Sequence, residues 1–247
     1  MDQATGPLSG PLSGRLADPA PAYLGLLVDW GGVMTTSVFE SFDRFAEREG
    51  LEAGAVATLF RTEPQARELL KGLEIGELAE ADFERGLGGL LGTEPDGLIR
   101  RLMQGAGPDP SMRAAVAAAR RQGVPTGLVS NSWGADGYPA EVLRTLFDGV
   151  VISGTVGVRK PSARIYRLGA ESIGLQPEQC VFVDDLTANL GAARELGMAT
   201  VHHTDAVRTI AELEELLGVD LGEQGAITNT AATNPAAQRP RTTERTS

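Results

Sequence analysis

The chain has 247 residues, 42% of them hydrophobic and 22% charged, which is ordinary for a globular protein and excludes a disordered or membrane-spanning one. The chain has 22 basic and 33 acidic residues, so its net charge is −11. Because it also lacks a Lys/Arg stripe, we expect no nucleic-acid partner. No uncharged apolar run approaches the roughly 18 residues that a membrane-spanning helix needs, so we expect no membrane partner either.

Cysteine usage and the first residues indicate a compartment. Cys180 is the only cysteine, which excludes an internal disulfide and a cysteine-based metal cluster and fits a reducing environment. The segment from Met1 to Tyr23 contains the acidic Asp2 and has neither a basic opening nor an apolar h-region, so it does not match a secretory signal. We therefore expect a cytoplasmic protein.

Both ends of the chain have compositions that favour disorder. Residues 6–14 spell GPLSGPLSG, a short repeat that buries too little apolar surface to offset its ordering entropy. We predict a flexible leader over residues 1–22. The polar stretch over residues 225–247 has almost no large hydrophobes, and we predict a disordered tail there.

The first predicted element is a strand, and helices follow it. The apolar run from Leu24 to Val28 is too short for a helix and precedes Gly31-Gly32, so it predicts a buried strand that ends at Asp29. Apolar residues then recur at helical spacing up to Gly50 and again after Phe83. Residues 35–107 are therefore predicted to be all helical.

The second half alternates between the two kinds of element. Asp109-Pro110-Ser111 resembles a helix start, and its apolar stripe stops near Gly123. Apolar runs with helical patterns between them then predict strands at 125–129, 150–152, 181–183 and 199–201. This alternation predicts an α/β fold, a Rossmann-like parallel sheet with helices on both faces.

Polar groups follow the predicted strands at the ends where parallel sheets bind ligands. They are Asp29, Ser130-Asn131, Lys160 in the segment after the third strand, and Asp184-Asp185. Carboxylates for a hard divalent cation, a lysine and a nucleophile are the minimal set for phosphoryl transfer.

Each of these features also has a plain structural interpretation. Asp29 before two glycines can be a turn, Ser130-Asn131 can be a capping loop, and Lys160 before a proline can be a solvated lysine. The pair Asp184-Asp185 is harder to explain in this way, because adjacent carboxylates repel each other unless a cation or hydrogen-bond donors compensate.

Four motifs in order make the chain from about residue 24 to 217 resemble the haloacid dehalogenase superfamily. The form D-x-D-G-T/V corresponds to DWGGV at 29–33, and an apolar strand ending in Ser/Thr-Asn corresponds to LVSN at 128–131. GVRKP at 157–161, followed by Ile165-Tyr166, is similar to the family's third motif. VFVDD at 181–185, followed by Asn189, is similar to its fourth.

The resemblance implies a domain organisation. The helical stretch is similar to the small α-helical cap of subfamily I-like members, which is inserted after the first motif. We therefore expect a Rossmann-like core formed by residues 23–34 and 108–224, with residues 35–107 as the cap. The division predicts an active site beneath the cap.

The resemblance also implies roles for the site residues. Asp29 is the expected nucleophile, forming an aspartyl-phosphate, and Mg2+ is expected on the Asp29 carboxylate, the Gly31 carbonyl and Asp185. Ser130 and the Asn131 amide are expected to bind the phosphoryl oxygens, with Lys160 neutralising their charge and orienting Asp29. Asp184 and Asn189 are expected just behind the metal ligands.

One departure from the family pattern concerns proton transfer. The second aspartate of motif one, normally the general acid and base, is Gly31 here. Such catalysis is typically worth about 10²- to 10⁴-fold, so its loss weakens turnover without abolishing it. We therefore expect a substrate with a good leaving group, such as an anomeric sugar phosphate or an acyl phosphate.

The resulting prediction is a magnesium-dependent phosphatase acting on a small phosphorylated metabolite. A metal-independent 2-haloacid dehalogenase is one alternative, although those enzymes generally carry Ser-x-Asn where this chain has Asp184-Asp185. A binding or regulatory protein that keeps the fold with weakened catalysis is another, supported by Gly31. The identity of the substrate and the oligomeric state stay open.

Overall fold

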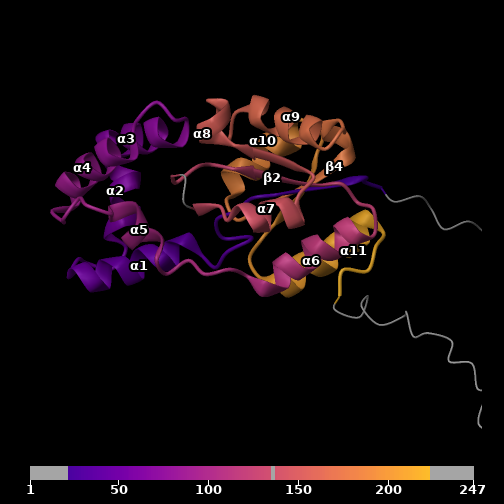
Figure 1. The fold of residues 1–247 in the computed structure, drawn as a ribbon, viewed down its shortest axis with the longest axis horizontal. Coiled ribbons are helices and arrows are strands. Elements are labelled where there is room, and N and C mark those ends of the chain that lie inside the picture. The colour runs from indigo at the N-terminus through magenta and orange to yellow at the C-terminus, as the bar shows by residue number, and fades with distance from the viewer. Residues whose placement is uncertain (1–21, 135–136, 223–247) are drawn as a thin grey trace, which may run out of the picture.

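A five-stranded parallel sheet lies at the centre of the computed structural model, which describes residues 22–134 and 137–222 (Figure 1). The chain runs from the central strand β1 outward to β2 and β3, and it then continues on the other side of β1 with β4 and β5. The chain therefore switches from one side of the sheet to the other between β1 and β4, and open parallel sheets bind ligands at such a switch point. The strands are Gly25–Val28 (β1), Thr126–Ser130 (β2), Gly149–Ile152 (β3), Cys180–Asp184 (β4) and Ala199–His202 (β5).

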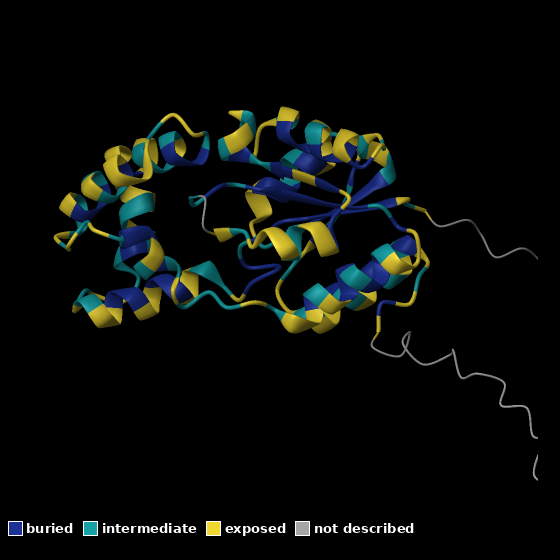
Figure 2. Cartoon of the chain, in the orientation of Figure 1, coloured by how far each residue is buried: buried dark blue, intermediate teal, exposed yellow. Residues whose placement is uncertain are grey.

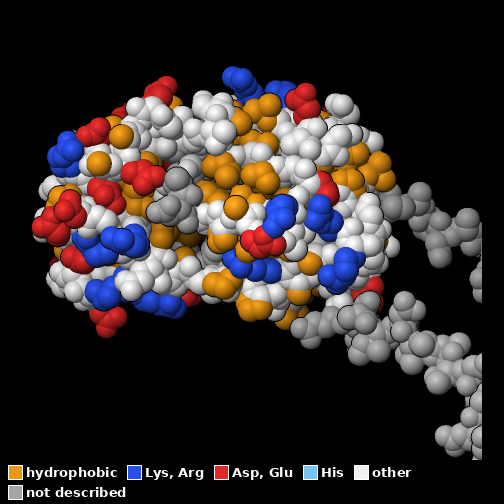
Figure 3. All heavy atoms as spheres, viewed as in Figure 1, with side chains coloured by type: hydrophobic (Ala, Val, Ile, Leu, Met, Phe, Trp, Pro, Cys, Tyr) orange, Lys and Arg blue, Asp and Glu red, His pale blue; other side chains and the backbone are white. Residues whose placement is uncertain are grey.

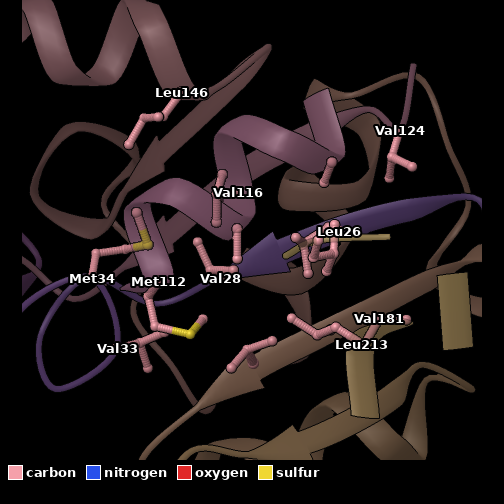
Figure 4. Packing of buried hydrophobic residues seen from close by; sticks show 14 of the residues in the cluster. Leu26, Val28, Val33, Met34, Met112, Val116, Val124, Leu146, Val181 and Leu213 are labelled. Atoms are coloured by element: carbon pink, nitrogen blue, oxygen red, sulfur yellow. The ribbon is translucent and has the colours of Figure 1, made fainter. Parts of the chain in front are cut away.

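Helices cover both faces of the sheet, which confirms the predicted α/β fold. The alternation along β1 shows why: Leu26 packs with Met112 and Leu213 on one face, whereas Leu27 packs with Ile165 on the other. Figure 4 shows the first of these clusters. The first face is covered by Pro110–Arg121 (α6), Ala140–Leu146 (α7) and Ala206–Leu217 (α11), and the second by Ala163–Ser172 (α9) and Thr187–Glu195 (α10).

Local sequence signals explain several element boundaries. The side chain of Asp109 accepts a hydrogen bond from the Met112 N–H at 2.9 Å, and Pro110 occupies the first helical position, so the predicted helix start is confirmed. Strand β2 begins and ends one residue later than predicted, which carries Ser130 into the strand. A four-residue helix, Ser153–Val156 (α8), and a short 3-10 helix, Pro177–Gln179 (η2), complete the connections.

The segment between β1 and α6 is helical, as predicted (Figure 1), and each of its helices carries both buried and exposed residues (Figure 2). Its buried residues form a hydrophobic cluster of their own. Phe45, Phe83 and Leu102 are fully buried in this cluster. The chain enters and leaves this part side by side, since Thr35 and Pro108 form an isolated antiparallel bridge. Its helices are Val38–Glu49 (α1), Ala55–Thr62 (α2), Pro64–Glu74 (α3), Glu80–Leu91 (α4) and Leu98–Met103 (α5).

This placing of the helices agrees with an inserted cap, and the division into a core and a cap at residues 35–107 stays a prediction. The predicted flexible leader, apart from Ala22, and the predicted tail lie outside the described residues. Among the described helices, none is long and apolar enough to cross a membrane.

Candidate active site

Three strands bring the predicted site residues to one edge of the sheet. Asp29 follows β1, Ser130 ends β2 and Asp184 ends β4, and these are neighbouring parallel strands. Lys160 comes from the loop between α8 and α9, and its side chain is 1% exposed. Its Nζ lies 2.7 Å from Asp29 Oδ1 and 2.7 Å from Asp184 Oδ2. The interpretation of Lys160 as a solvated lysine is therefore wrong.

The charges at this edge do not balance. Burial by itself lowers the pKa of Lys160, but Asp29 and Asp184 more than reverse this, so the pKa of Lys160 is raised and its ammonium keeps its charge. One ammonium thus faces three carboxylates, since oxygens of Asp29, Asp184 and Asp185 all lie within 4.8 Å of one another. The cluster retains excess negative charge.

Asp184 is committed to protein partners. It is fully buried, and besides Lys160 its carboxylate accepts hydrogen bonds from the Leu186 N–H at 2.8 Å and from Asn189 Nδ2 at 3.0 and 3.1 Å. Donors therefore surround both of its oxygens. This arrangement suits a residue that supports the site from behind, the position expected for Asp184 and Asn189.

Asp29 and Asp185 differ from Asp184 because both also line a cavity. Burial, together with repulsion by Asp184 and Asp185, raises the pKa of Asp29 to about 7 against the lowering effect of Lys160. Burial and then repulsion by Asp184 raise the pKa of Asp185 to about 6. A divalent cation would relieve this repulsion, so the donor set fits a hard metal ion with oxygen ligands.

The two glycines after Asp29 have different reasons to be there. Gly32 has φ +72°, and a Cβ at this position would overlap the Asp185 carboxylate, so only glycine lets that side chain approach the loop. Gly31 has no left-handed backbone, and its nearest obstacle to a Cβ is the Val38 side chain at 3.0 Å. The backbone therefore explains Gly32 but does not require glycine at 31.

Ser130 and Asn131 lie beside the carboxylates and have different neighbours. The hydroxyl of Ser130 is 2.9 Å from the hydroxyl of Tyr138. The side chain of Asn131 bonds the main chain of Lys160 twice, donating to its carbonyl at 3.2 Å and accepting from its N–H at 2.8 Å. Asn131 therefore fixes the loop that carries Lys160, a role the sequence did not reveal.

Two further residues at the site carry little or no sequence signal. Tyr138 lines the cavity, and burial raises the pKa of its hydroxyl, which keeps its proton next to Ser130. Glu74 ends α3, is buried, and forms an ion pair with the partly exposed Arg159, next to Lys160 in the chain. Burial raises the pKa of Glu74 to about 7, although Arg159 lowers it. The only sequence signal of Tyr138 is that it follows the second motif closely in the chain, and nothing in the sequence distinguishes Glu74.

A single cavity of about 990 Å³ connects the acidic cluster with the inserted helices. Five of the predicted site residues contribute to its wall: Asp29, Gly31, Ser130, Asn131 and Asp185. The remainder comes largely from α1, α4, α5 and the segment after β2, and α2 contributes Phe60. A Rossmann-like sheet with a lysine-bridged acidic cluster at its switch point, opening into one cavity, defines an enzyme of the α/β class.

Comparison with known proteins identifies the family. Residues 23–197 match the haloacid dehalogenase-like hydrolases, and the chain belongs to this family. It is 30% identical to fructose-1-phosphate phosphatase YqaB of Escherichia coli, over 72% of this chain and 95% of that protein. The sesquiterpene phosphatase astK of Aspergillus oryzae is 30% identical over 59% of this chain and 77% of its own length.

Other relatives share only part of their length or only the fold. Bifunctional epoxide hydrolase 2 of Rattus norvegicus is 32% identical over 45% of this chain, which spans only 22% of that protein. A haloacid dehalogenase (HAD) family enzyme of Bacteroides thetaiotaomicron has been solved with magnesium and inorganic phosphate. It superposes with a TM-score of 0.52 at 20% identity, over 73% of this chain and 93% of its own. A crystal structure of a dehalogenase gives a TM-score of 0.59 at 21% identity, over 82% and 99%.

Proposed function

We propose that this hydrolase is a magnesium-dependent phosphatase that acts on a small phosphorylated substrate through an aspartyl-phosphate on Asp29. The observation that carries the proposal is the shared cavity, into which Asp29, Asp185, Ser130 and Asn131 all open. The phosphatases among the relatives support the same reaction class. A cytoplasmic location stays a proposal that rests on the single, buried Cys180.

The residues fit a magnesium ion. Asp29 and Asp185 would hold it together with the Gly31 carbonyl, while Asp184 stays engaged with Lys160 and Asn189. When bound, the ion supplies positive charge that neutralises the phosphoryl oxygens. The magnesium complex of a structural neighbour agrees with this choice of metal.

The chain's own residues account for the transfer. The Asp29 carboxylate attacks phosphorus, the bond to the ester oxygen breaks, and that oxygen leaves with the electron pair and takes a proton from water. Water then attacks phosphorus, and the bond between phosphorus and the Asp29 oxygen breaks with its electron pair returning to the carboxylate. The attacking water gives a proton to the hydroxide left by the first step, and inorganic phosphate leaves. Lys160 orients Asp29 through its 2.7 Å contact, and Ser130 and the Asn131 N–H donate to the phosphoryl oxygens.

A phosphate-release assay over a panel of phosphorylated metabolites, with and without Mg2+, tests the proposal. We expect release that depends on the metal and falls by at least about 10³-fold in Asp29→Asn, because the amide is a poor nucleophile. Halide release from 2-haloacids without metal would instead indicate a dehalogenase. Binding of phosphorylated compounds without turnover would indicate a binding protein.

A further inference from the structure

The cavity continues from the acidic cluster into an apolar chamber. We use this term for the part of the wall formed by Phe39 and Phe42 of α1, Phe60 of α2 and Trp133 after β2. Figure 3 shows hydrophobic side chains gathered in the middle of the face drawn, with charged side chains on either side. At about 990 Å³ the cavity is at the upper end of the range for small-molecule sites and far larger than a phosphoryl group needs.

The aromatic side chains of the apolar chamber pack against one another. The ring centroid of Trp133 lies 5.5 Å from that of Phe42 and 5.9 Å from that of Phe60, in edge-on or tilted arrangements. Phe42 is 4% exposed, so its ring is held by the core of the inserted helices. Because Trp133 follows Ser130 by three residues, the same segment joins the phosphoryl end to the apolar wall.

Three charged side chains of the cavity wall, those of Glu84, Arg101 and Arg113, already have partners in the protein. Glu84 accepts hydrogen bonds from the N–H groups at the start of α5, at 3.3 and 3.0 Å. Arg101 pairs with Glu49 at 3.1 Å and donates to two carbonyls. Arg113 lies 5.3 Å above the ring of Trp30 and donates to a carbonyl. These three side chains are therefore less available to replace water around a polyhydroxylated group, whereas Arg100, also in the wall, makes no hydrogen bond or ion pair with the described residues.

We propose that the apolar chamber binds the organic group of the substrate, so that the enzyme acts on phosphate monoesters of bulky apolar or aromatic alcohols. The proposal rests on the phosphatase function proposed above. Removing apolar surface from water stabilises the bound ester by about fourfold in affinity for each buried methylene. A longer alkyl chain on the substrate should therefore raise kcat/KM without any new polar contact.

The test uses phosphate esters that differ in the bulk of the organic group but hardly in the acidity of the alcohol that they release. The 4-methyl-, 4-butyl- and 4-octylphenyl phosphates release phenols of nearly equal acidity, and 4-(hydroxymethyl)phenyl phosphate is the polar match. We expect kcat/KM to rise at least about tenfold from the methyl to the butyl ester. The hydroxymethyl ester should not exceed the methyl ester.

Variants connect this rise to the apolar chamber. Phe60→Ala should remove most of it, and Phe39→Ala, whose side chain is 47% exposed, serves if Phe60→Ala does not fold. Val207→Ala, at an exposed position on α11 outside the cavity wall, should keep the rise. A rise that survives both phenylalanine variants would overturn the assignment of the chamber.

The outcomes separate this inference from the proposed function. Phosphate release that depends on Asp29 and Mg2+ but not on the length of the alkyl chain overturns the apolar substrate class and leaves the phosphatase in place. If the metabolite panel is hydrolysed but none of these esters is, the apolar substrate class is overturned and the phosphatase stands. If neither the panel nor the esters are hydrolysed, the phosphatase is overturned, and calorimetric titration with the matching 4-alkylphenylphosphonates decides the ligand class without turnover. A dissociation constant that falls with chain length supports an apolar ligand, and a constant one overturns it.

Discussion

Lys160 is one of only two lysines in the chain and bridges two buried carboxylates. We expect Lys160→Met to lower the free energy of unfolding by about 3–5 kcal/mol without metal, because it leaves Asp29 and Asp184 without their cation. Urea denaturation measures this. Lys71→Met is the matched control: Lys71 is 56% exposed and lies 3.7 Å from Glu68, so its loss should cost less than about 0.5 kcal/mol. Equal effects would contradict the bridging role.

Gly31 is the residue that should set the dependence on the leaving group. Without an acid at this position, rates over a series of phosphate esters should fall steeply as the leaving-group pKa rises. Gly31→Asp should flatten that slope and raise the rate on alkyl esters by about tenfold or more, because its backbone does not require glycine. Val38→Ala, added to both forms, makes room for the new side chain. An unchanged slope with chemistry rate-limiting would reject the interpretation.

At the scale of elements, the end of α3 is tied to the sheet side of the site. The Ser153 hydroxyl, at the start of α8, donates to the Glu74 carbonyl and accepts from the Ser132 N–H at 2.8 Å. The Glu74 carboxylate pairs with Arg159. Helix α3 and the loop that carries Arg159 and Lys160 are thus joined through Glu74. The ionisation of Glu74 should therefore affect the free energy of unfolding.

The raised pKa of Glu74 predicts a pH dependence. Between its ordinary pKa of 4.5 and about 7, the folded chain holds a proton that the unfolded chain has released, so this residue's contribution to stability falls as the pH rises through that window. Glu74→Gln cannot titrate. The wild type should lose at most about 3 kcal/mol relative to Glu74→Gln between pH 5 and 8, measured by urea denaturation at both pH values. A difference that is constant with pH, or that grows in favour of the wild type, would contradict this.

At the scale of the whole molecule, metal binding and folding should be linked. A site assembled from the ends of β1 and β4 exists only in the folded chain, so Mg2+ at about 100 times its dissociation constant should stabilise the fold by about 2.7 kcal/mol. Asp185→Asn should abolish this gain. Asp82→Asn, an exposed carboxylate on α4 paired with Arg85, should keep it. Chemical denaturation of the wild type and the two variants, in Mg2+ and in EDTA, measures this stabilisation. Equal stabilisation of all three proteins by Mg2+ would indicate nonspecific ion effects.

Sequence alone determined the α/β fold and the place of Asp29, Ser130 and Asp185 at one edge of the sheet, whereas Lys160, in the loop between α8 and α9, was assigned to the site only through its motif. Apolar runs and periodicity record which residues are buried, and polar groups directly after strands must share the edge where parallel strands end. Local signals such as Asp109 before Pro110 fixed helix starts equally well. These features depend on neighbours close in the chain.

Only the tertiary structure decided which distant residues meet. Glu74 and Arg159 are 85 positions apart, and the hydrogen bonds of Asn131 to Lys160 span 29 positions. The apolar chamber likewise joins α1, α2 and the segment after β2. Periodicity predicts that a phenylalanine is buried but not whether it faces another helix or a cavity, because that depends on how separate elements pack.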